Sequence, residues 1–140
     1  MTKSLADSIA RVQTLMDGIV SFRFKPEYPP DMIGAYPACI VYMGSGEWHC
    51  QAGDQKEWRG NIVIEVLVTR LPDLADAFEK LTGYAEDVAN ALEAEPTLNE
   101  TCDAIMFPII QEPISETIWL SDRPISLRFQ VPITVTNNIV

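Results

Sequence analysis

The chain has 140 residues, of which 47% are hydrophobic, and its 20 acidic against 10 basic residues give a formal net charge of -10. This length predicts one domain, residues 1–140, because it is enough for one hydrophobic core and short for two. A surface this acidic repels nucleic acid phosphates and anionic membranes, which argues against both as binding partners. Solubility alone is also a sufficient reason for such a charge.

Three scattered cysteines, Cys39, Cys50 and Cys102, are an odd number without a CxxC spacing. They predict neither a disulfide framework nor a zinc knuckle, and they favour a reducing intracellular compartment. The N-terminal segment carries charges throughout, and the most apolar later run is interrupted by Glu65. We therefore expect neither a signal peptide nor a membrane-spanning segment.

The N-terminal segment has the spacing of an amphipathic helix. Its apolar residues recur at intervals of three and four, as Leu5, Ile9, Val12, Met16 and Ile19. This spacing predicts a helix from about Ser4 to Asp17, with Ser4 as its N-cap and Gly18 at its end. Residues 21–37 follow with four prolines, which predicts an extended, irregular connection.

The next segments have the composition of β-structure. Ala38 to Met43 is an apolar run that predicts a strand, and Gly44 to Gly46 predict a turn after it. Glu47 to Glu57 is polar around one Trp. We interpret it as either the rest of a hairpin or a loop that is mobile in an isolated subunit.

Trp58 to Arg70 predicts a long strand. One face carries Ile62, Ile64, Val66 and Val68. The opposite face is mixed, because Glu65 is polar while Val63 and Leu67 are apolar. This pattern indicates a strand with one buried face and a second face that contacts a neighbour.

A second amphipathic helix is predicted to begin near Pro72 and Asp73, since proline and acidic residues are favoured in a first helical turn. Its apolar stripe consists of Leu74, Phe78, Leu81, Ala85, Val88 and Leu92. The other face is acidic, because the segment from Asp73 to Glu95 holds seven acidic residues and one basic residue, Lys80. A helix with this stripe must pack on a sheet to be stable.

The rest of the chain predicts further strands. One lies near Ala104 to Ile110 and a shorter piece at Thr117 to Leu120, and Pro108 and Pro113 indicate an edge strand or a bulge. From Pro124 to Thr136, apolar and polar residues alternate along one final strand with one buried face. These elements together predict an α+β domain. An N-terminal helix and one long amphipathic helix are expected to pack on a mostly antiparallel sheet of four to five strands.

No group of residues has the pattern of a catalytic, cofactor or metal site. In a strand, His49, the only histidine, shares a face with Glu47 while Cys50 points the other way, which leaves too few ligands for zinc. A thiol nucleophile at Cys39 or Cys102 would need a base, and His49 is the sole candidate. The sequence therefore predicts a protein that is not an enzyme. Two alternatives stay open: a small enzyme or ligand-binding domain that uses the polar loop around His49, and a host-interaction module that acts through the acidic helix.

The order of elements resembles a family of phage structural proteins. A helix, a proline-rich connection, a strand running into a polar loop and a long strand ending in TRLPD (Thr69 to Asp73) come first. An amphipathic helix and closing strands that end in LRFQVPITVT (Leu127 to Thr136) follow. This order, from Leu5 to Val135, is similar to that of the tail terminator or tail completion proteins of long-tailed bacteriophages. The resemblance rests on pattern and size.

The resemblance implies a structural virion protein without a catalytic residue or cofactor. Proteins of this family form a ring, usually hexameric, in the head–tail joining region, or neck. There they end polymerisation of the tail tube and present a surface to the head. The implied partners are further copies of the chain, the tail tube protein and the head–tail connector protein, and no membrane. DNA passes through the lumen without specific binding. The implied location is the head-proximal end of the virion tail, after assembly in the host cytoplasm.

A ring also implies subunit contacts, which closed rings make between unlike patches. The mixed face of the Trp58 to Arg70 strand and the tryptophans in polar surroundings are the candidates. The residues expected at subunit or partner contacts are Trp48, Trp58, Arg59, Val63, Glu65, Leu67, Trp119 and Arg128. Of these, Arg128 is expected to pair with Glu65, within or between subunits.

Overall fold

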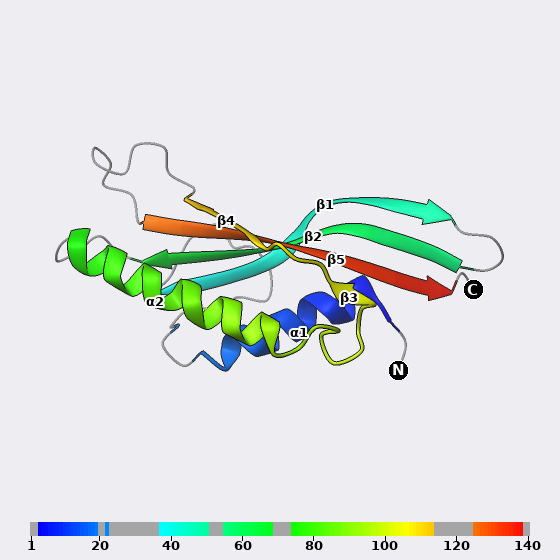
Figure 1. The fold of residues 1–140 in the computed structure, drawn as a ribbon, viewed down its shortest axis with the longest axis horizontal. Helices are drawn as coiled ribbons and strands as arrows, with labels where there is room; N and C mark the ends of the chain where they lie inside the picture. The colour runs from blue at the N-terminus through cyan, green and yellow to red at the C-terminus, as the bar shows by residue number, and fades with distance from the viewer. Residues whose placement is uncertain are drawn as a thin grey trace.

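The computed structural model describes residues 3–19, 22, 37–50, 55–68, 74–113 and 125–138. They form two helices and five strands (Figure 1). In chain order these are α1 (Leu5–Asp17), β1 (Ala38–Cys50), β2 (Gln55–Val68), α2 (Leu74–Glu93), β3 (Ala104–Ile105), β4 (Ile110–Pro113) and β5 (Ile125–Asn138). All strand pairs are antiparallel. The α+β fold expected from the sequence is therefore confirmed.

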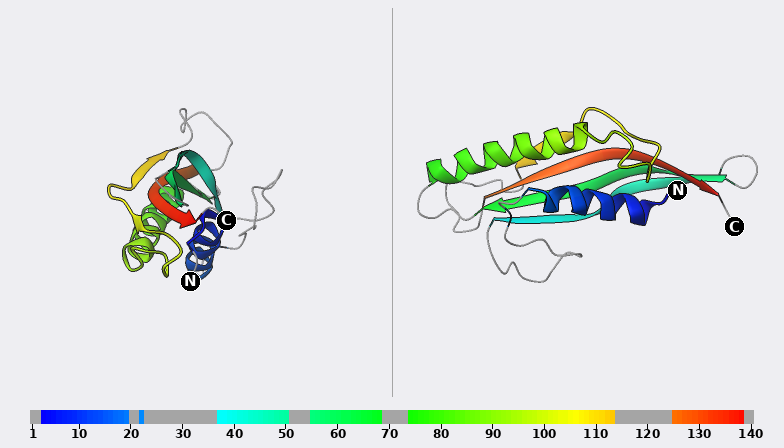
Figure 2. Two further views of the ribbon diagram at one scale, coloured as in Figure 1. Left: turned by 90° about the vertical axis from the view of Figure 1, so that its right-hand side faces the viewer. Right: turned by 90° about the horizontal axis from the view of Figure 1, so that it is seen from below.

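The strands form one sheet with the order β1-β2-β5-β3. β4 also pairs with β5, along residues 127–130, whereas β3 pairs with residues 133–134. β5 is thus an inner strand, paired with β2 from Val68 opposite Ile125 to Gln55 opposite Asn138. Both helices lie against the same face of this sheet (Figure 2). We call this face the helix face and the opposite one the second face.

The first helix begins and ends where its capping residues predict. The side chain of Ser4 accepts a hydrogen bond from the Asp7 N–H at 2.9 Å, which satisfies a free donor of the first turn. The helix ends before Gly18, whose N–H donates to Leu15 O at 3.2 Å. The start expected for the second helix, Pro72 and Asp73, lies outside the described residues.

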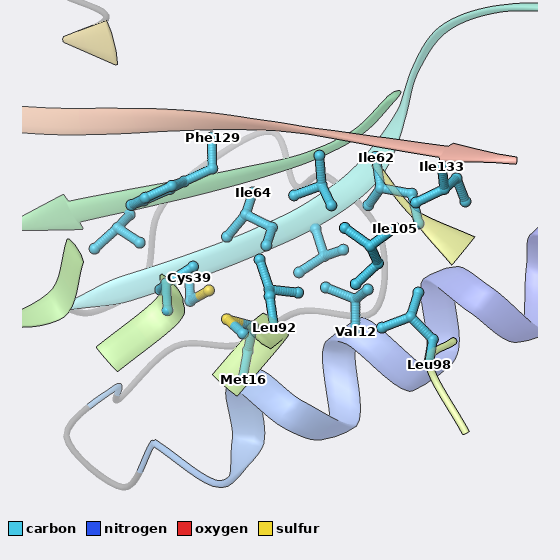
Figure 3. Close-up of a cluster of buried hydrophobic side chains, with 14 of the residues drawn as sticks. Val12, Met16, Cys39, Ile62, Ile64, Leu92, Leu98, Ile105, Phe129 and Ile133 are labelled. Atoms are coloured by element: carbon cyan, nitrogen blue, oxygen red, sulfur yellow. The ribbon is translucent and has the colours of Figure 1, made fainter. Parts of the chain in front are cut away.

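The hydrophobic core fills the space between the helices and the sheet (Figure 3). Both helix stripes reach it, since Val12 and Met16 of α1 and Val88 and Leu92 of α2 are almost completely buried. They meet sheet side chains that include Cys39, Val41, Ile62, Ile64, Val66, Phe129, Val131 and Ile133. The alternation expected for β2 and β5 is therefore confirmed. Burial of each large side chain contributes roughly 1.5–3 kcal/mol, which holds the helices on the sheet.

The expected turn at Gly44 to Gly46 is wrong. β1 continues through these residues, and its pairing with β2 shifts between Met43 and Gly46, where β1 holds one extra residue. Gly46 lies opposite Gly60, and a Cβ on either would overlap the Trp58 ring. Gly46 and Gly60 thus leave space beside a β-bulge for the Trp58 indole to pack on their backbone. The glycines of this segment do not reverse the chain.

The strand expected at Ala104 to Ile110 is split into two short strands. β3 and β4 both pair with β5, with Pro108 between them. This agrees with the edge position that the prolines indicate, because proline has no N–H for a strand ladder. The expected connection at residues 21–37, except Phe22 and Pro37, and the expected strand piece at Thr117 to Leu120 lie outside the described residues.

Candidate subunit interface

The second face carries a polar network that joins β1, β2 and β5. Tyr42 donates a hydrogen bond from Oη to Glu65 Oε1 at 2.5 Å, and Arg128 Nη2 lies 3.3 Å from the same oxygen. Glu65 and Arg128 are cross-strand partners in the β2–β5 register, so their ion pair forms within the chain. Burial, together with the Glu65 carboxylate, raises the pKa of Tyr42 to about 12. Tyr42 is therefore a donor at neutral pH.

The network continues toward the β4 edge. Gln130 donates from Nε2 to Glu112 Oε1 at 3.1 Å, and Asn61 donates from Nδ2 to Gln130 Oε1 at 3.5 Å. These partly buried groups bond to one another within the chain, although Arg128 Nε is buried without a hydrogen-bond partner among the described residues. The polar side chains of this face therefore form hydrogen bonds within the chain.

The second face leaves less apolar surface for a neighbour than its sequence suggests. Val63 is almost fully buried and Leu67 is partly buried. Trp58 also departs from the expectation, because its side chain is only 2% exposed and belongs to the core on the helix face. The reason is strand parity: Trp58 shares the helix face with Ile62. Trp119 lies outside the described residues.

The hairpin formed by residues 44–50 and 55–60, which we call the distal hairpin, extends past both helices (Figure 1). Trp48 on it is 53% exposed, and Lys56 Nζ lies 5.0 Å from the centre of its ring. Arg59 is exposed and pairs with the nearly buried Glu57. The strands cover Glu47 to Cys50 and Gln55 to Glu57, which favours the hairpin interpretation of this segment over a loop.

His49 has the surroundings that its position in a strand predicts. Its Nε2 lies 3.4 Å from Glu47 Oε2, and both side chains are largely exposed. Cys50, the next residue of the strand, belongs to the opposite face. Among the described residues, no group of three or more His, Cys, Asp or Glu side chains can hold a metal ion.

The two buried cysteines have the environment of core residues. Cys39 and Cys102 are buried, whereas Cys50 is exposed. Burial raises the pKa of the Cys102 thiol to about 11. Since the thiolate is the nucleophile, this thiol is unreactive at neutral pH.

The outward face of α2 is the most acidic surface of the described part of the chain. Its exposed acidic residues are Glu79, Glu86, Asp87 and Glu93. They join no ion pair with a described residue, whereas Lys80 is tied to Asp76 at 3.2 Å. The face is thus a region of uncompensated negative charge.

The feature that sequence reasoning missed is a set of exposed apolar side chains at the edges of the sheet. Five large hydrophobic residues of the described chain are more than half exposed, namely Met43, Trp48, Met106, Phe107 and Ile110. Of these five, only Trp48 is expected at a contact from the sequence. For Met106, Phe107 and Ile110 the signal was the apolar run that surrounds Pro108, because a proline within an apolar segment indicates an unpaired sheet edge.

No model of a known protein family matches this chain, and no curated protein matches it. Within the described ranges, neither helix combines the length and the apolar character that crossing a bilayer requires. The proposal on function therefore rests on the sequence and the geometry of the chain.

Proposed function

We propose that this chain is the subunit of a hexameric ring at the head-proximal end of a phage tail tube. In this role it ends tube polymerisation and joins the tail to the head connector. The observation that carries the proposal is the order of elements. Helix, hairpin, helix, short edge strands and long closing strand follow one another in the order on which the resemblance to tail terminator proteins rests.

The distribution of charge supports the proposal. A ring that lines the route of a genome needs a lumen that does not hold DNA, and negative charge repels phosphate. The outward face of α2 offers such a surface, since Glu79, Glu86 and Glu93 are exposed there without an ion-pair partner among the described residues.

The proposal assigns no catalytic role to any side chain. Among the described residues, His49 forms an ion pair with Glu47 alone, and Cys102 is a buried thiol with a raised pKa. Neither has the second group that nucleophilic or metal-assisted catalysis requires. Binding between protein surfaces is the chemistry that these residues support.

Localisation on particles tests the proposal. Gold-labelled antibody against this chain, applied to purified virions of the phage that encodes it, should mark the junction of head and tail in electron micrographs. An antibody against the tail tube protein is the matched control and should mark the shaft. Label at the distal tip, on the head surface or on no particle would contradict the proposal.

The acidic face of α2 also supports a second candidate, a host-interaction module that binds a basic protein. This candidate predicts that the chain is absent from virions. It also predicts that the chain is recovered from infected cells as a monomer or dimer bound to a basic partner. The same labelling experiment therefore separates the two functions.

A further inference from the structure

The segment between α2 and β3, residues 94–103, has an uncommon backbone. We call it the α2–β3 connection. Leu98, Asn99 and Glu100 have successive φ angles of 49°, 56° and 66°. A left-handed backbone is costly for a residue with a Cβ, and outside glycine it occurs mostly at single Asn or Asp residues. Three such residues in a row persist only where the surrounding structure holds them.

Part of what holds this turn lies within the connection. Leu98 is completely buried in the hydrophobic core, together with Val12 of α1 (Figure 3). The Thr101 hydroxyl donates a hydrogen bond to Leu98 O at 2.7 Å. Asn99 and Glu100 are exposed, so burial does not fix their side chains. The turn is thus anchored at its first residue and just after its last.

The other contacts that hold the turn come from α1. Thr101 O accepts a hydrogen bond from the Ser4 N–H at 3.0 Å and another from Ser8 Oγ at 2.9 Å. Ser8 is completely buried. Arg11 donates to both carboxylate oxygens of Glu95, at 2.9 and 2.7 Å. Ser4, Ser8 and Arg11 are spaced by four and three, so they share the side of α1 that faces the connection.

The sheet is held in a different way. β2 lies between β1 and β5, and it pairs with β5 along all 14 of its residues. Among the described residues other than glycine, those with a positive φ all belong to the connection. The cost of a left-handed backbone therefore falls on the connection and not on the paired strands. Local opening is favoured where such a cost is carried and where few strand hydrogen bonds resist it.

We propose that α1 and the α2–β3 connection form a latch, which opens as one unit while the sheet stays folded. In the closed latch, α1 holds the left-handed turn through Thr101 and Glu95. A turn that relaxes to ordinary backbone moves Thr101 O away from Ser8, so α1 loses its partners. A detached α1 of 13 residues is in turn too short to stay helical alone. The inference goes beyond the proposed function and stands independently of it.

Native-state hydrogen exchange of the whole chain tests the latch, under conditions in which the exchange rate reports the opening equilibrium. The Val12 amide reports on α1 and the Ile64 amide on β2. The Cys102 amide, which donates to Thr97 O at 3.3 Å, reports on the connection. We expect Val12 and Cys102 to share one protection factor that is lower than that of Ile64 by about tenfold or more.

A pair of variants in the connection tests the coupling. Glu100→Gly and Glu100→Ala both remove a charge that acts on Lys3, so they differ only in the Cβ. In a helix glycine is less stable than alanine, but at this positive φ the Cβ is the costly group. We expect exchange in Glu100→Gly to be slower than in Glu100→Ala by about threefold to tenfold, and by the same factor at Cys102 and Val12.

A matched pair in α1 reverses the sign. Thr14 is exposed, and its hydroxyl bonds within α1, to Ala10 O. Because this position is helical, Thr14→Gly should exchange faster than Thr14→Ala by about threefold to tenfold. The factor should again be the same at Val12 and at Cys102, although Thr14 belongs to the other element.

Three results would overturn the proposal. The first is an effect of the Glu100 pair at Cys102 alone, or of the Thr14 pair at Val12 alone, because the two elements would then open separately. The second is equal protection of Val12, Cys102 and Ile64 in the parent chain, since only complete unfolding would then expose them. The third is faster exchange in Glu100→Gly than in Glu100→Ala, which would mean that the turn is not held left-handed. Each of these results leaves the tail function unaffected.

Discussion

At the scale of single residues, the distal hairpin depends on two glycines. Gly46 and Gly60 face each other across β1 and β2, and the Trp58 indole fills the space that side chains there would need. Trp58 is buried although it lies close to the exposed Trp48, its cross-strand partner. Because Trp58 packs on these glycines, the hydrophobic core extends into the distal hairpin.

Gly60→Ala should lower the free energy of unfolding by about 1–3 kcal/mol, the usual cost of overpacking. The new Cβ would overlap backbone atoms of Ser45 and Gly46 as well as Trp58. Gly83→Ala is the matched control, because a Cβ there meets nothing within 4 Å. In the middle of α2 it should stabilise the protein by about 1 kcal/mol. Denaturant unfolding measures both, and equal stabilities of the two variants would contradict the packing described for Trp58.

Asp103 ties the N-terminus to the closing strand. Its carboxylate accepts hydrogen bonds from Lys3 Nζ at 2.6 Å and from Thr136 Oγ1 at 2.5 Å. Burial alone would raise the pKa of Asp103, but these two bonds outweigh it and lower the pKa. The folded chain thus holds this carboxylate ionised more firmly than the unfolded chain does. Its contribution to stability is therefore present above the ordinary Asp pKa and is lost as the pH falls through the lowered one.

Asp103→Asn should be less stable than the parent chain at about pH 7, by on the order of 1 kcal/mol. The difference between the two should shrink as the pH falls below about 4, because the parent then loses its carboxylate. Asp87→Asn, on the exposed side of α2, serves as control and should leave stability unchanged at both pH values. Urea unfolding across this pH range measures the difference. A difference that stays constant into acid would show that charge at Asp103 does not contribute.

His49→Ala should leave ring formation and particle assembly within a few fold of the parent chain. The reason is that, among the described residues, the ion pair of His49 is with the exposed Glu47, and such a pair contributes about 0–1 kcal/mol. Sedimentation velocity and complementation of a phage that lacks the gene measure the two effects. A folded, ring-forming variant that fails to complement would reveal a role for the imidazole and favour the enzyme alternative.

At the scale of elements, long periodic patterns were predictable and edges were not. α1, α2, β2 and β5 each repeat their apolar spacing over many residues, so the sequence predicts both their type and their buried face. β3 and β4 are too short to carry a period. Gly44 to Gly46 have the composition of a turn, and only pairing with β2 shows that they form a bulge.

The candidate interface was predictable to a smaller extent. The Glu65–Arg128 pair follows from two polar faces, but its place within one subunit depends on the β2–β5 register. The exposure of Phe107 and Ile110 depends on which strands lie beside them, and periodicity does not report this. Acidic residues on α2 could be assigned to its outer side because the apolar stripe defines the inner one.

Leu92→Ala should lower the free energy of unfolding by about 2–5 kcal/mol, since Leu92 is fully buried between α2 and the sheet. Glu93→Ala, one residue further along the helix, is exposed and should change stability by less than about 0.5 kcal/mol. Thermal and denaturant unfolding measure both variants. A small effect of Leu92→Ala would mean that α2 is not held to the sheet by its stripe.

At the scale of the whole molecule, the two helices close the core on one face of the sheet, while apolar side chains stay exposed at the sheet edges. Polar groups of the second face bond to one another, and the core is closed by the two helices. Among the described residues, Arg128 Nε is buried without a hydrogen-bond partner, apolar side chains are exposed at both ends of the strand order, and the outward face of α2 is acidic. In the proposed ring, the negative charge of the α2 face would repel the phosphates of the passing DNA.

The most direct test of the central claim is electron microscopy of particles made by a phage that lacks this chain, with the intact gene supplied in trans as control. We predict free heads and tail tubes of uncontrolled, excessive length that do not join. Tails of normal length that still join heads in the absence of the chain would contradict the terminator function.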